Sequence, residues 1–529
     1  MIEAWYWRSL PLEKRTGSEV FAALFRPTNP SGIATLLESP YPTPIEHPQL
    51  SRYSICAGAP RLVDGIPQMW TPEVGEVFPF LENLFQQGVG RDEQDEGDEV
   101  VFSSPSPPAS SSPPASSSPP APSSPPAPPS PPAPPPPHLP FTGGWLGWLG
   151  YDVAWEIEQL PHDKIDPLPF PIAFWYEPDC FAVLDHAQQI LWLAASDASR
   201  LDELQDKLAK KDAAKEFPIS PCPDIPVSSS PPLFLTSQAD YETAVNQAKK
   251  YIQAGDIFQA NLSLRFQAST SAAGWEIYQA LQKINPSPFA SYWQTPWGEV
   301  ISCSPERLVM LQNRQAETRP IAGTRSRGVT LEQDMQLAED LLSNTKERAE
   351  HIMLVDLERN DLGRVCEWGT VTVDELLTIE RYSHVMHLVS NIKGTLKGEC
   401  LRHGEAERTA IDLIRATFPG GTITGCPKVR CMEIIEELEP VRRSLFYGSC
   451  GYLDWRGHLD LNILIRTLLL APASGEAGEE PLLGYSALNT VWGQVGAGIV
   501  ADSDPEKEWY ESLHKAQAQL AALKMLNNQ

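Results

Sequence analysis

Two pairs of glutamates could act together on one ion. Glu347 and Glu350 lie three residues apart in KERAEH, and Glu508 and Glu511 repeat that spacing in KEWYES. Residues three apart on a helix share one face, so each pair can point at a single place. Four clustered carboxylates would need a cation, and a hard divalent ion prefers carboxylate oxygens. Because most acidic residues are exposed, two ordinary solvated helix faces are the alternative.

Two further polar side chains lie among apolar neighbours. His387 belongs to YSHVMHLVS, whose apolar residues predict burial. A buried imidazole is either a hydrogen-bonded core residue or an acid–base group with a shifted pKa. Arg466 alternates with apolar residues in LDLNILIRTL, which predicts a strand. A guanidinium in such surroundings needs an anionic partner, which is either a carboxylate of the protein or an anionic ligand.

Two glycine-rich stretches resemble nucleotide-binding loops only in part. PGGTITGCPK (Pro419–Lys428) lacks the Gly-Lys-Ser/Thr ending of a phosphate loop, which disfavours a nucleoside triphosphate site. VGAGIVADS (Val495–Ser503) lacks the third glycine of a dinucleotide fingerprint. The backbone N–H groups of Gly496, Ala497 and Gly498, ahead of a predicted helix, would instead suit a carboxylate.

The charge balance narrows the class of partner. The chain has 529 residues, with 41 Lys and Arg against 68 Asp and Glu, which gives a formal net charge of −27. This excess of negative charge argues against nucleic acid and against an anionic membrane surface as partners. An anionic small substrate would therefore need a local cationic group or a metal ion.

Cysteine usage and apolar runs bear on location. The nine cysteines are scattered, show no zinc-binding spacing and fit reduced thiols better than a disulfide framework. The N-terminal MIEAWYWRSL has no apolar signal core, and no run of about 18 apolar residues predicts a membrane helix. We therefore expect a cytoplasmic protein without a membrane partner.

A low-complexity tract interrupts the first part of the chain. Residues 103–137 contain only Ser, Pro and Ala, with 18 prolines among 35 residues. Such a sequence has no apolar surface to bury and should be a solvated, partly polyproline-like spacer; an SH3-type ligand is a less favoured alternative. With the preceding acidic run RDEQDEGDE, it predicts a disordered insertion at about 91–138.

The remaining pattern predicts two folded parts. We expect residues 1–214 to form an amino-terminal domain around the insertion, 215–235 to form a linker, and 236–529 to form a second domain. Apolar spacing in the second part predicts helices over 237–254, 331–357, 429–437 and 505–523, and strands over 256–266, 448–455, 460–470 and 493–501. Helices and strands without a regular βαβ period favour an α+β fold.

These segments together resemble the chorismate-utilising enzymes, which include the first components of anthranilate synthase and aminodeoxychorismate synthase and the isochorismate and salicylate synthases. The strings that carry the resemblance are GDIFQANLSLRF, SPERL, RPIAGTRSRG, AEHIMLVDLERNDLG, YSHVMHLVS, FPGGTITGCPKVRCMEIIEELEP, GYLDWRGHLDLNILIRT and GAGIVADSDPEKEWYES. LLES, SRYSI and GGWLGWLGYD resemble the amino-terminal domain of that family more loosely. The resemblance implies a chorismate-binding fold with two sheet-and-helix halves around a central cleft.

The resemblance also implies a metal site. Glu350 and Glu511 would bind Mg²⁺, and the ion would hold the ring carboxylate of chorismate. Glu347 and Glu508 would reach the ion directly or through water.

Substrate contacts follow from the same motifs. Arg466 and the 496–498 backbone would hold the enolpyruvyl carboxylate. His387 would lie near the ring and assist loss of the C4 hydroxyl or proton transfer at C2. Thr422 would contact the substrate, and Glu306 of SPERL would be an acid–base group at the ring.

Gln259 bears on the type of reaction. Family members that add water carry a general-base lysine at this position, and a neutral amide cannot deprotonate water. Ammonia is already nucleophilic and needs no such base. The resemblance therefore favours amination of chorismate at C4 or at C2.

The choice between C4 and C2 rests on few residues. Asn261, the PGGTITG spelling and NPSPFAS are similar to aminodeoxychorismate synthase. Ala322 stands where some aminodeoxychorismate synthases have a nucleophilic lysine, so C4 amination here would require direct attack by ammonia. Leu37, Glu38 and Ser39 of LLES are similar to the tryptophan pocket of anthranilate synthase, with a buried strand end as the alternative.

These features favour an Mg²⁺-dependent aminodeoxychorismate synthase component I, of folate biosynthesis, that receives ammonia from a separate glutaminase subunit. The chain shows no glutaminase triad of its own. Anthranilate synthase component I, of tryptophan biosynthesis, is the first alternative. A non-catalytic protein that binds chorismate or tryptophan is the second.

The predicted insertion generates a first test. Deleting residues 103–137 should leave chorismate turnover and the thermal midpoint unchanged, because the tract is predicted to lie outside the folded core. Steady-state turnover with ammonium salt and a thermal melt check this, and a large loss of activity in the deletion variant would contradict it.

Overall fold

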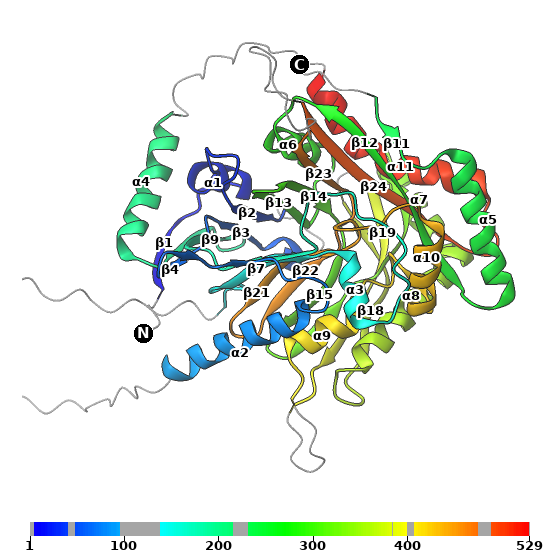
Figure 1. Ribbon diagram of the computed structural model, residues 1–529, viewed down its shortest axis with the longest axis horizontal. Helices are drawn as coiled ribbons and strands as arrows, with labels where there is room; N and C mark the ends of the chain where they lie inside the picture. The colour runs from blue at the N-terminus through cyan, green and yellow to red at the C-terminus, as the bar shows by residue number, and fades with distance from the viewer. Residues whose placement is uncertain are drawn as a thin grey trace, which may run out of the picture.

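The computed structural model describes residues 5–40, 48–95, 138–214, 231–382, 385–398, 407–473 and 488–527 (Figure 1). The predicted insertion lies outside these residues, apart from 91–95 and His138, and so does the predicted linker up to residue 230. Residues 91–95 complete helix α2 (Val77–Asp95), where the sequence predicted a loop. Gln, Glu and Arg favour helices, which explains why α2 continues into the acidic run.

Among the described residues, twelve strands pair into one large sheet. Its order is β1-β10-β9-β3-β2-β13-β14-β23-β24-β12-β11, with β20 paired to β12. The strands are β1 (Tyr6–Pro11), β2 (Ala34–Glu38), β3 (Tyr53–Ala57), β9 (Cys180–Asp185), β10 (Ile190–Ala195), β11 (Leu233–Phe234), β12 (Gln259–Thr270), β13 (Phe289–Thr295), β14 (Gly298–Ser304), β20 (Gly425–Cys426), β23 (Thr467–Pro472) and β24 (Asn489–Ile499).

A second sheet contains ten of the described strands. Its order is β17-β19-β16-β15-β22-β21-β7-β8-β6, with β18 paired to β19. The strands are β6 (Met69–Trp70), β7 (Gly144–Leu149), β8 (Ala173–Tyr176), β15 (Arg307–Gln312), β16 (Gln315–Thr318), β17 (Ile321–Ser326), β18 (Thr372–Arg381), β19 (Val385–Thr395), β21 (Ser449–Asp454) and β22 (Leu459–Asn462). The short strands β4 (Leu62–Val63) and β5 (Ile66–Pro67) form a separate hairpin.

The two sheets share one hydrophobic core. Trp148 of β7 packs edge-on against Trp293 of β13, with 5.7 Å between ring centroids. Such an edge-to-face contact adds about 0.5–1.5 kcal/mol to the apolar burial itself. Because β7 belongs to the second sheet and β13 to the first, this contact ties one sheet to the other.

The two predicted domains contribute to both sheets. Leu36 of β2 pairs with Tyr292 of β13 in the first sheet, and Trp148 of β7 pairs with Cys450 of β21 in the second. Strand pairing therefore runs continuously between the part before residue 214 and the part after residue 236. The predicted linker at 215–235 therefore divides the sequence into two segments, and its role as a boundary between domains stays a prediction.

Helices cover the outer sides. Five helices pack on the first sheet: α1 (Gly17–Leu24), α4 (Ala198–Ala214), α5 (Gln238–Ala254), α6 (Gly274–Ile284) and α11 (Pro505–Asn527). The remaining helices are α3 (Ala154–Ile157), α7 (Leu331–Ser343), α8 (Thr345–Gly363), α9 (Ala410–Thr417) and α10 (Lys428–Leu438), with 3-10 turns at Pro48–Ser51 and Tyr151–Val153. Figure 1 shows α5 and α11 beside the long strands β12 and β24. No helix in the described part of the chain is long and apolar enough to cross a bilayer.

The fold differs from the sequence prediction at two places. The helix predicted over 331–357 is broken at Asn344, whose Oδ1 accepts a hydrogen bond from the N–H of Glu347 (3.1 Å) and begins α8. The strand predicted over 460–470 is two strands, β22 and β23, that belong to different sheets. Arg466 lies at this crossover with a positive φ of 50°, rather than within a strand. An apolar pattern persists through both breaks because each flanking element buries an apolar face: α7 packs in one hydrophobic cluster and α8 in another, and β23 divides its side chains between two clusters.

Candidate active site

Gln259, Glu350 and Gly498 lie together where α8 meets strands β12 and β24. The Gln259 amide donates a hydrogen bond to Glu350 Oε1 at 3.0 Å. A side chain on Gly498 would begin 2.3 Å from Gln259 Nε2, so only glycine leaves this amide in place. Strand pairing sets the arrangement, since Gly498 lies opposite Asn261 in the β12–β24 ladder.

The acids of α8 and α11 share one electrostatic environment. Burial raises the pKa of Glu350, and the nearby Glu511 adds to that rise. Burial also raises the pKa of Glu508, again with a contribution from Glu511. The ammonium of Lys515 opposes both shifts; it lies 3.0 Å from Glu511 Oε1 and 2.9 Å from the carbonyl oxygen of Gly496. Glu511 is therefore close enough to both Glu350 and Glu508 to affect their charge.

Glu347 has a different partner. Its Oε1 lies 2.7 Å from Arg325, and its buried Oε2 has no hydrogen-bond partner. Oε2 would lie 2.1 Å from a Cβ on Gly323, so the carboxylate packs against strand β17. Within the described ranges, no three His, Cys, Asp or Glu side chains are grouped so that they could hold a metal ion by themselves.

His387 of β19 is a buried, neutral imidazole. Burial, followed by the charge of Arg466, lowers its pKa to about 3. Its Nδ1 lies 3.0 Å from the Thr324 hydroxyl and 3.4 Å from the carbonyl oxygen of Gly323. A carbonyl only accepts hydrogen bonds, which favours a proton on Nδ1 and leaves Nε2 as an acceptor. Nε2 is buried and has no partner.

Arg466 lines a small cavity with His387, Tyr382 and Asn285. Its Nη1 donates to Asn285 Oδ1 at 3.2 Å, and burial lowers its pKa. No carboxylate of the described residues lies within ion-pair distance of this guanidinium. Of the two partners considered from the sequence, an anionic ligand therefore fits better than a structural ion pair.

Glu306 is a second buried acid, close to Thr422. Burial raises its pKa to about 7, although the Thr422 hydroxyl and then Arg466 oppose the rise. Glu306 Oε1 and Thr422 Oγ1 are both buried without a hydrogen-bond partner. A carboxyl with this pKa exchanges its proton near neutral pH, as a general acid or base requires.

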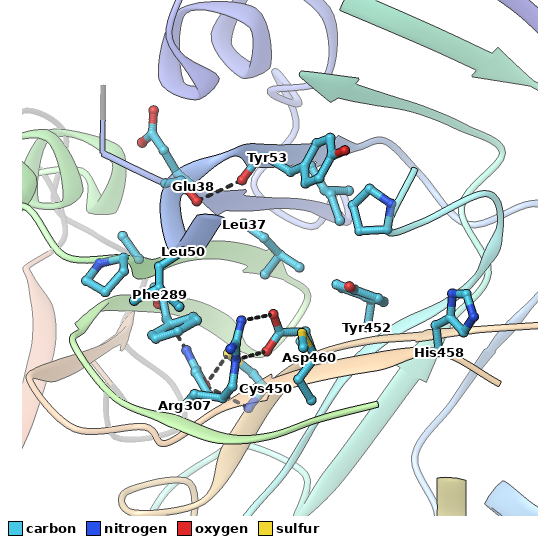
Figure 2. A pocket seen from close by; sticks show the side chains of 18 of the residues that line it. Leu37, Glu38, Leu50, Tyr53, Phe289, Arg307, Cys450, Tyr452, His458 and Asp460 are labelled. Atoms are coloured by element: carbon cyan, nitrogen blue, oxygen red, sulfur yellow. Dashed lines mark hydrogen bonds and ion pairs between the residues drawn. The ribbon is translucent and has the colours of Figure 1, made fainter. Parts of the chain in front are cut away.

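A larger cavity lies between the two sheets, and Leu37, Glu38 and Ser39 line it (Figure 2). The Glu38 carboxylate is held by Ser18, Tyr278 and Gln282, so it serves as a buried hydrogen-bond acceptor. Figure 2 shows it directed away from the other labelled side chains. The assignment of this cavity to tryptophan stays a prediction.

Sequence patterns did not single out several polar residues of these sites. Arg307 forms a two-pronged ion pair with Asp460, at 2.8 Å for each contact, on the wall of the larger cavity. Thr324 contacts His387, and Lys515 contacts Glu511. Lys515 could have been found from its position one helical turn after Glu511, which is typical of an ion pair.

The chain is similar to known chorismate enzymes along most of its length. It is 55% identical over 527 residues to an anthranilate synthase component I-like protein of Synechocystis sp., covering 99% of this chain and 93% of that protein. It is 43% identical to aminodeoxychorismate synthase component 1 of Bacillus subtilis, in a match that covers 73% of this chain and 78% of that protein. It is 39% identical to a Synechocystis protein named anthranilate synthase component 1, in a match that covers 73% of this chain and 77% of that protein.

A solved structure shows the same fold. Anthranilate synthase component I of Streptococcus pneumoniae superposes with a TM-score of 0.64 at 29% identity, covering 89% of this chain and 92% of that one. The family model described as chorismate binding enzyme matches residues 117–521. With the α+β fold, these matches show that the chain belongs to the chorismate-binding enzymes and is an enzyme that uses chorismate.

Proposed function

We propose that this enzyme aminates chorismate at C4 to give 4-amino-4-deoxychorismate, with ammonia supplied by a separate glutaminase subunit. The observation that carries amination is the neutral Gln259 amide, bonded to Glu350 at 3.0 Å where a water-activating base would have to be. Amination at C4 is supported by the similarity of Asn261, PGGTITG and NPSPFAS to aminodeoxychorismate synthase; overall identity does not separate the reactions, since the relative at 55% is named anthranilate synthase component I-like and the Bacillus subtilis aminodeoxychorismate synthase is at 43%.

The acids beside β24 fit a bound Mg²⁺. This ion commonly takes one or two protein carboxylates and completes its shell with water and substrate oxygens, so a cage of three or more acids is not needed. Glu350 and Glu511 would hold it, because a cation would relieve both the burial of the Glu350 carboxylate and its repulsion by the exposed Glu511. Glu508 and Glu347 would act through water. Bound there, Mg²⁺ would neutralise the ring carboxylate of chorismate.

Arg466 and β24 would hold the second carboxylate of the substrate. The guanidinium is buried and has no ion-pair partner among the described carboxylates. The enolpyruvyl carboxylate would therefore form an ion pair with it. The 496–498 segment lies within β24 and pairs with β12, so only an N–H group that points away from β12 could add a hydrogen bond. Thr422, with its unpartnered hydroxyl, would contact the ring side of the substrate.

Glu306 and His387 would handle the protons. Protonated Glu306 would donate its proton to the C4 hydroxyl, which leaves as water while ammonia forms the new C–N bond. The resulting ammonium group would then return a proton to the Glu306 carboxylate. Neutral His387 would accept a hydrogen bond at Nε2 and orient the departing group. Ala322 has no nucleophilic group, so ammonia would attack carbon directly.

Amination at C2 to give anthranilate is the second candidate. The solved Streptococcus pneumoniae structure is named anthranilate synthase component I, and the Synechocystis relative at 39% identity is named anthranilate synthase component 1. Both reactions would use the same carboxylate anchors, so the groups near the ring decide between them. Because the family is enzymatic, a non-catalytic binding protein is no longer favoured.

Product identification separates the two reactions. The purified full chain, incubated with chorismate, Mg²⁺ and ammonium salt, should form a product that an added lyase converts to 4-aminobenzoate. Anthranilate is fluorescent and would appear without the lyase. Fluorescent anthranilate as the main product would overturn the C4 proposal, whereas 4-aminobenzoate formed only with the lyase would support it.

The metal assignment makes a second prediction. Glu511→Gln should abolish Mg²⁺-dependent turnover while leaving the thermal midpoint close to that of the native chain, because this side chain is 54% exposed. Glu506→Gln, at an exposed position of the same helix, is the matched control and should behave like the native enzyme. Full activity in the Glu511 variant would reject the assignment.

The buried acid Glu306 makes a third prediction, in which activity and stability change in opposite directions. Its pKa is about 7 in the folded state against an ordinary 4.5, so the folded state binds more protons between these pH values. The native chain therefore loses stability as pH rises through that window, up to about 3 kcal/mol. Glu306→Gln cannot ionise and should lower turnover about 100-fold or more.

Urea unfolding at two pH values checks this prediction. The Glu306→Gln variant should be the more stable protein at pH 8 and about equal to the native chain near pH 4.5. A variant that is less stable than the native chain at pH 8 would show that the carboxylate is not a buried, functionally strained group.

A further inference from the structure

A fully buried ion pair lies directly behind the proposed substrate site. Arg443 follows α10, and its side chain is 1% exposed; Glu439, four residues earlier at the C-terminal end of α10, is 5% exposed. Two contacts join them, Nη2 to Oε1 at 2.7 Å and Nε to Oε2 at 3.0 Å. Although burial alone would lower the pKa of Arg443, Glu439 raises it above its usual value, so the guanidinium stays charged.

Arg443 joins two segments that the proposed reaction uses. Its Nη2 donates to the carbonyl oxygen of Asn261 at 2.7 Å, and its Nη1 donates to the carbonyl oxygen of Ile423 at 2.8 Å. Asn261 lies two residues after Gln259 on β12, and Ile423 follows Thr422. The rigid fork of a guanidinium fixes the spacing of two acceptors, which a lysine ammonium does not do.

Glu439 adds a third attachment. Its Oε1 accepts hydrogen bonds from the N–H (2.8 Å) and the hydroxyl (2.7 Å) of Ser263 on β12. The pair thus binds β12 at two positions and the 419–425 segment at one. Aromatic rings hold the guanidinium on both sides, with Tyr151 at 4.7 Å and Tyr447 at 4.6 Å from its central carbon.

The position of these contacts shows what they do. Backbone pairing between β12 and the 419–425 segment ends with the bond from Asn261 N–H to the carbonyl oxygen of Thr424 (3.0 Å). Closer to Thr422, the direct link from Asn261 is a 3.5 Å contact to the Thr422 carbonyl oxygen. Arg443 therefore supplies the strong attachment at the point where the segment leaves the strand.

We infer that Arg443, held by Glu439, is a positioning residue that sets the distance between the Gln259 strand and Thr422, and so the width of the chorismate site. This inference rests on the proposed substrate site, but not on which amine is formed. A loss of about 1 Å in such positioning commonly lowers turnover by a large factor, so the pair should influence chorismate binding without touching chorismate.

Arg443→Lys tests the inference in the full chain. The variant keeps the charge and loses the fork, so the Kd for chorismate, measured by calorimetry with Mg²⁺, and the KM for chorismate should both rise about tenfold or more. The KM for ammonium salt should stay near the native value. Arg61→Lys is the matched control, because Arg61 forms a buried ion pair with Glu177 (3.1 Å) away from the site, beyond β6 and β8.

A milder change covers the case in which Arg443→Lys does not fold. Ser263→Ala removes one donor to Glu439 and should raise the Kd for chorismate about two- to fivefold. If both 443 and 263 variants bind chorismate within twofold of the native chain while their unfolding midpoints fall as in Arg61→Lys, the pair is only structural and the inference is overturned. Formation of anthranilate would overturn the proposed C4 reaction but leave this inference standing.

Discussion

The cost of burying charge governs this site. Glu306 carries a pKa near neutrality because it is buried, and Arg466 is buried with no ion-pair partner among the described carboxylates. An unpaired buried charge destabilises a protein by several kcal/mol, so a chain keeps such groups where a ligand completes them. A substrate with two carboxylates, bound with a cation, would supply every missing counter-charge.

The sandwich of two sheets makes this arrangement feasible. Gln259 and Gly498 come from paired strands of the first sheet, His387 comes from the second, and Arg466 lies at the crossover that joins them. These residues are far apart in the sequence, and long-range strand pairing brings them close together in space. The positive φ of Arg466 places its side chain toward the small cavity rather than along either strand. The proposed anion site would give this local irregularity at the crossover a functional reason.

Sequence patterns could predict the elements but not their breaks. The helix over 237–254 was predicted, and in the structure a left-handed Gly255 ends it, because apolar spacing and caps are local signals. The crossover at Arg466 and the break at Asn344 were missed, because an apolar period continues through both. The two acidic turns were predicted to share one ion; the structure places Glu511 close enough to Glu350 and Glu508 to affect their charge and pairs Glu347 with Arg325. That difference depends on strand β17, which no helical spacing could reveal.

Neutral side chains determine what the proposed site can do as much as charged ones. Gln259 cannot remove a proton from water, and Ala322 cannot form a covalent adduct, so neither hydration nor a lysine-linked route is open. In the proposed mechanism the protons are handled by Glu306, which exchanges its proton near pH 7, and by His387, which stays neutral. The proposed nucleophile must then be reactive without a base. Neutral ammonia is, whereas water and ammonium are not, so the proposed amination would gain from a glutaminase subunit that delivers ammonia unprotonated.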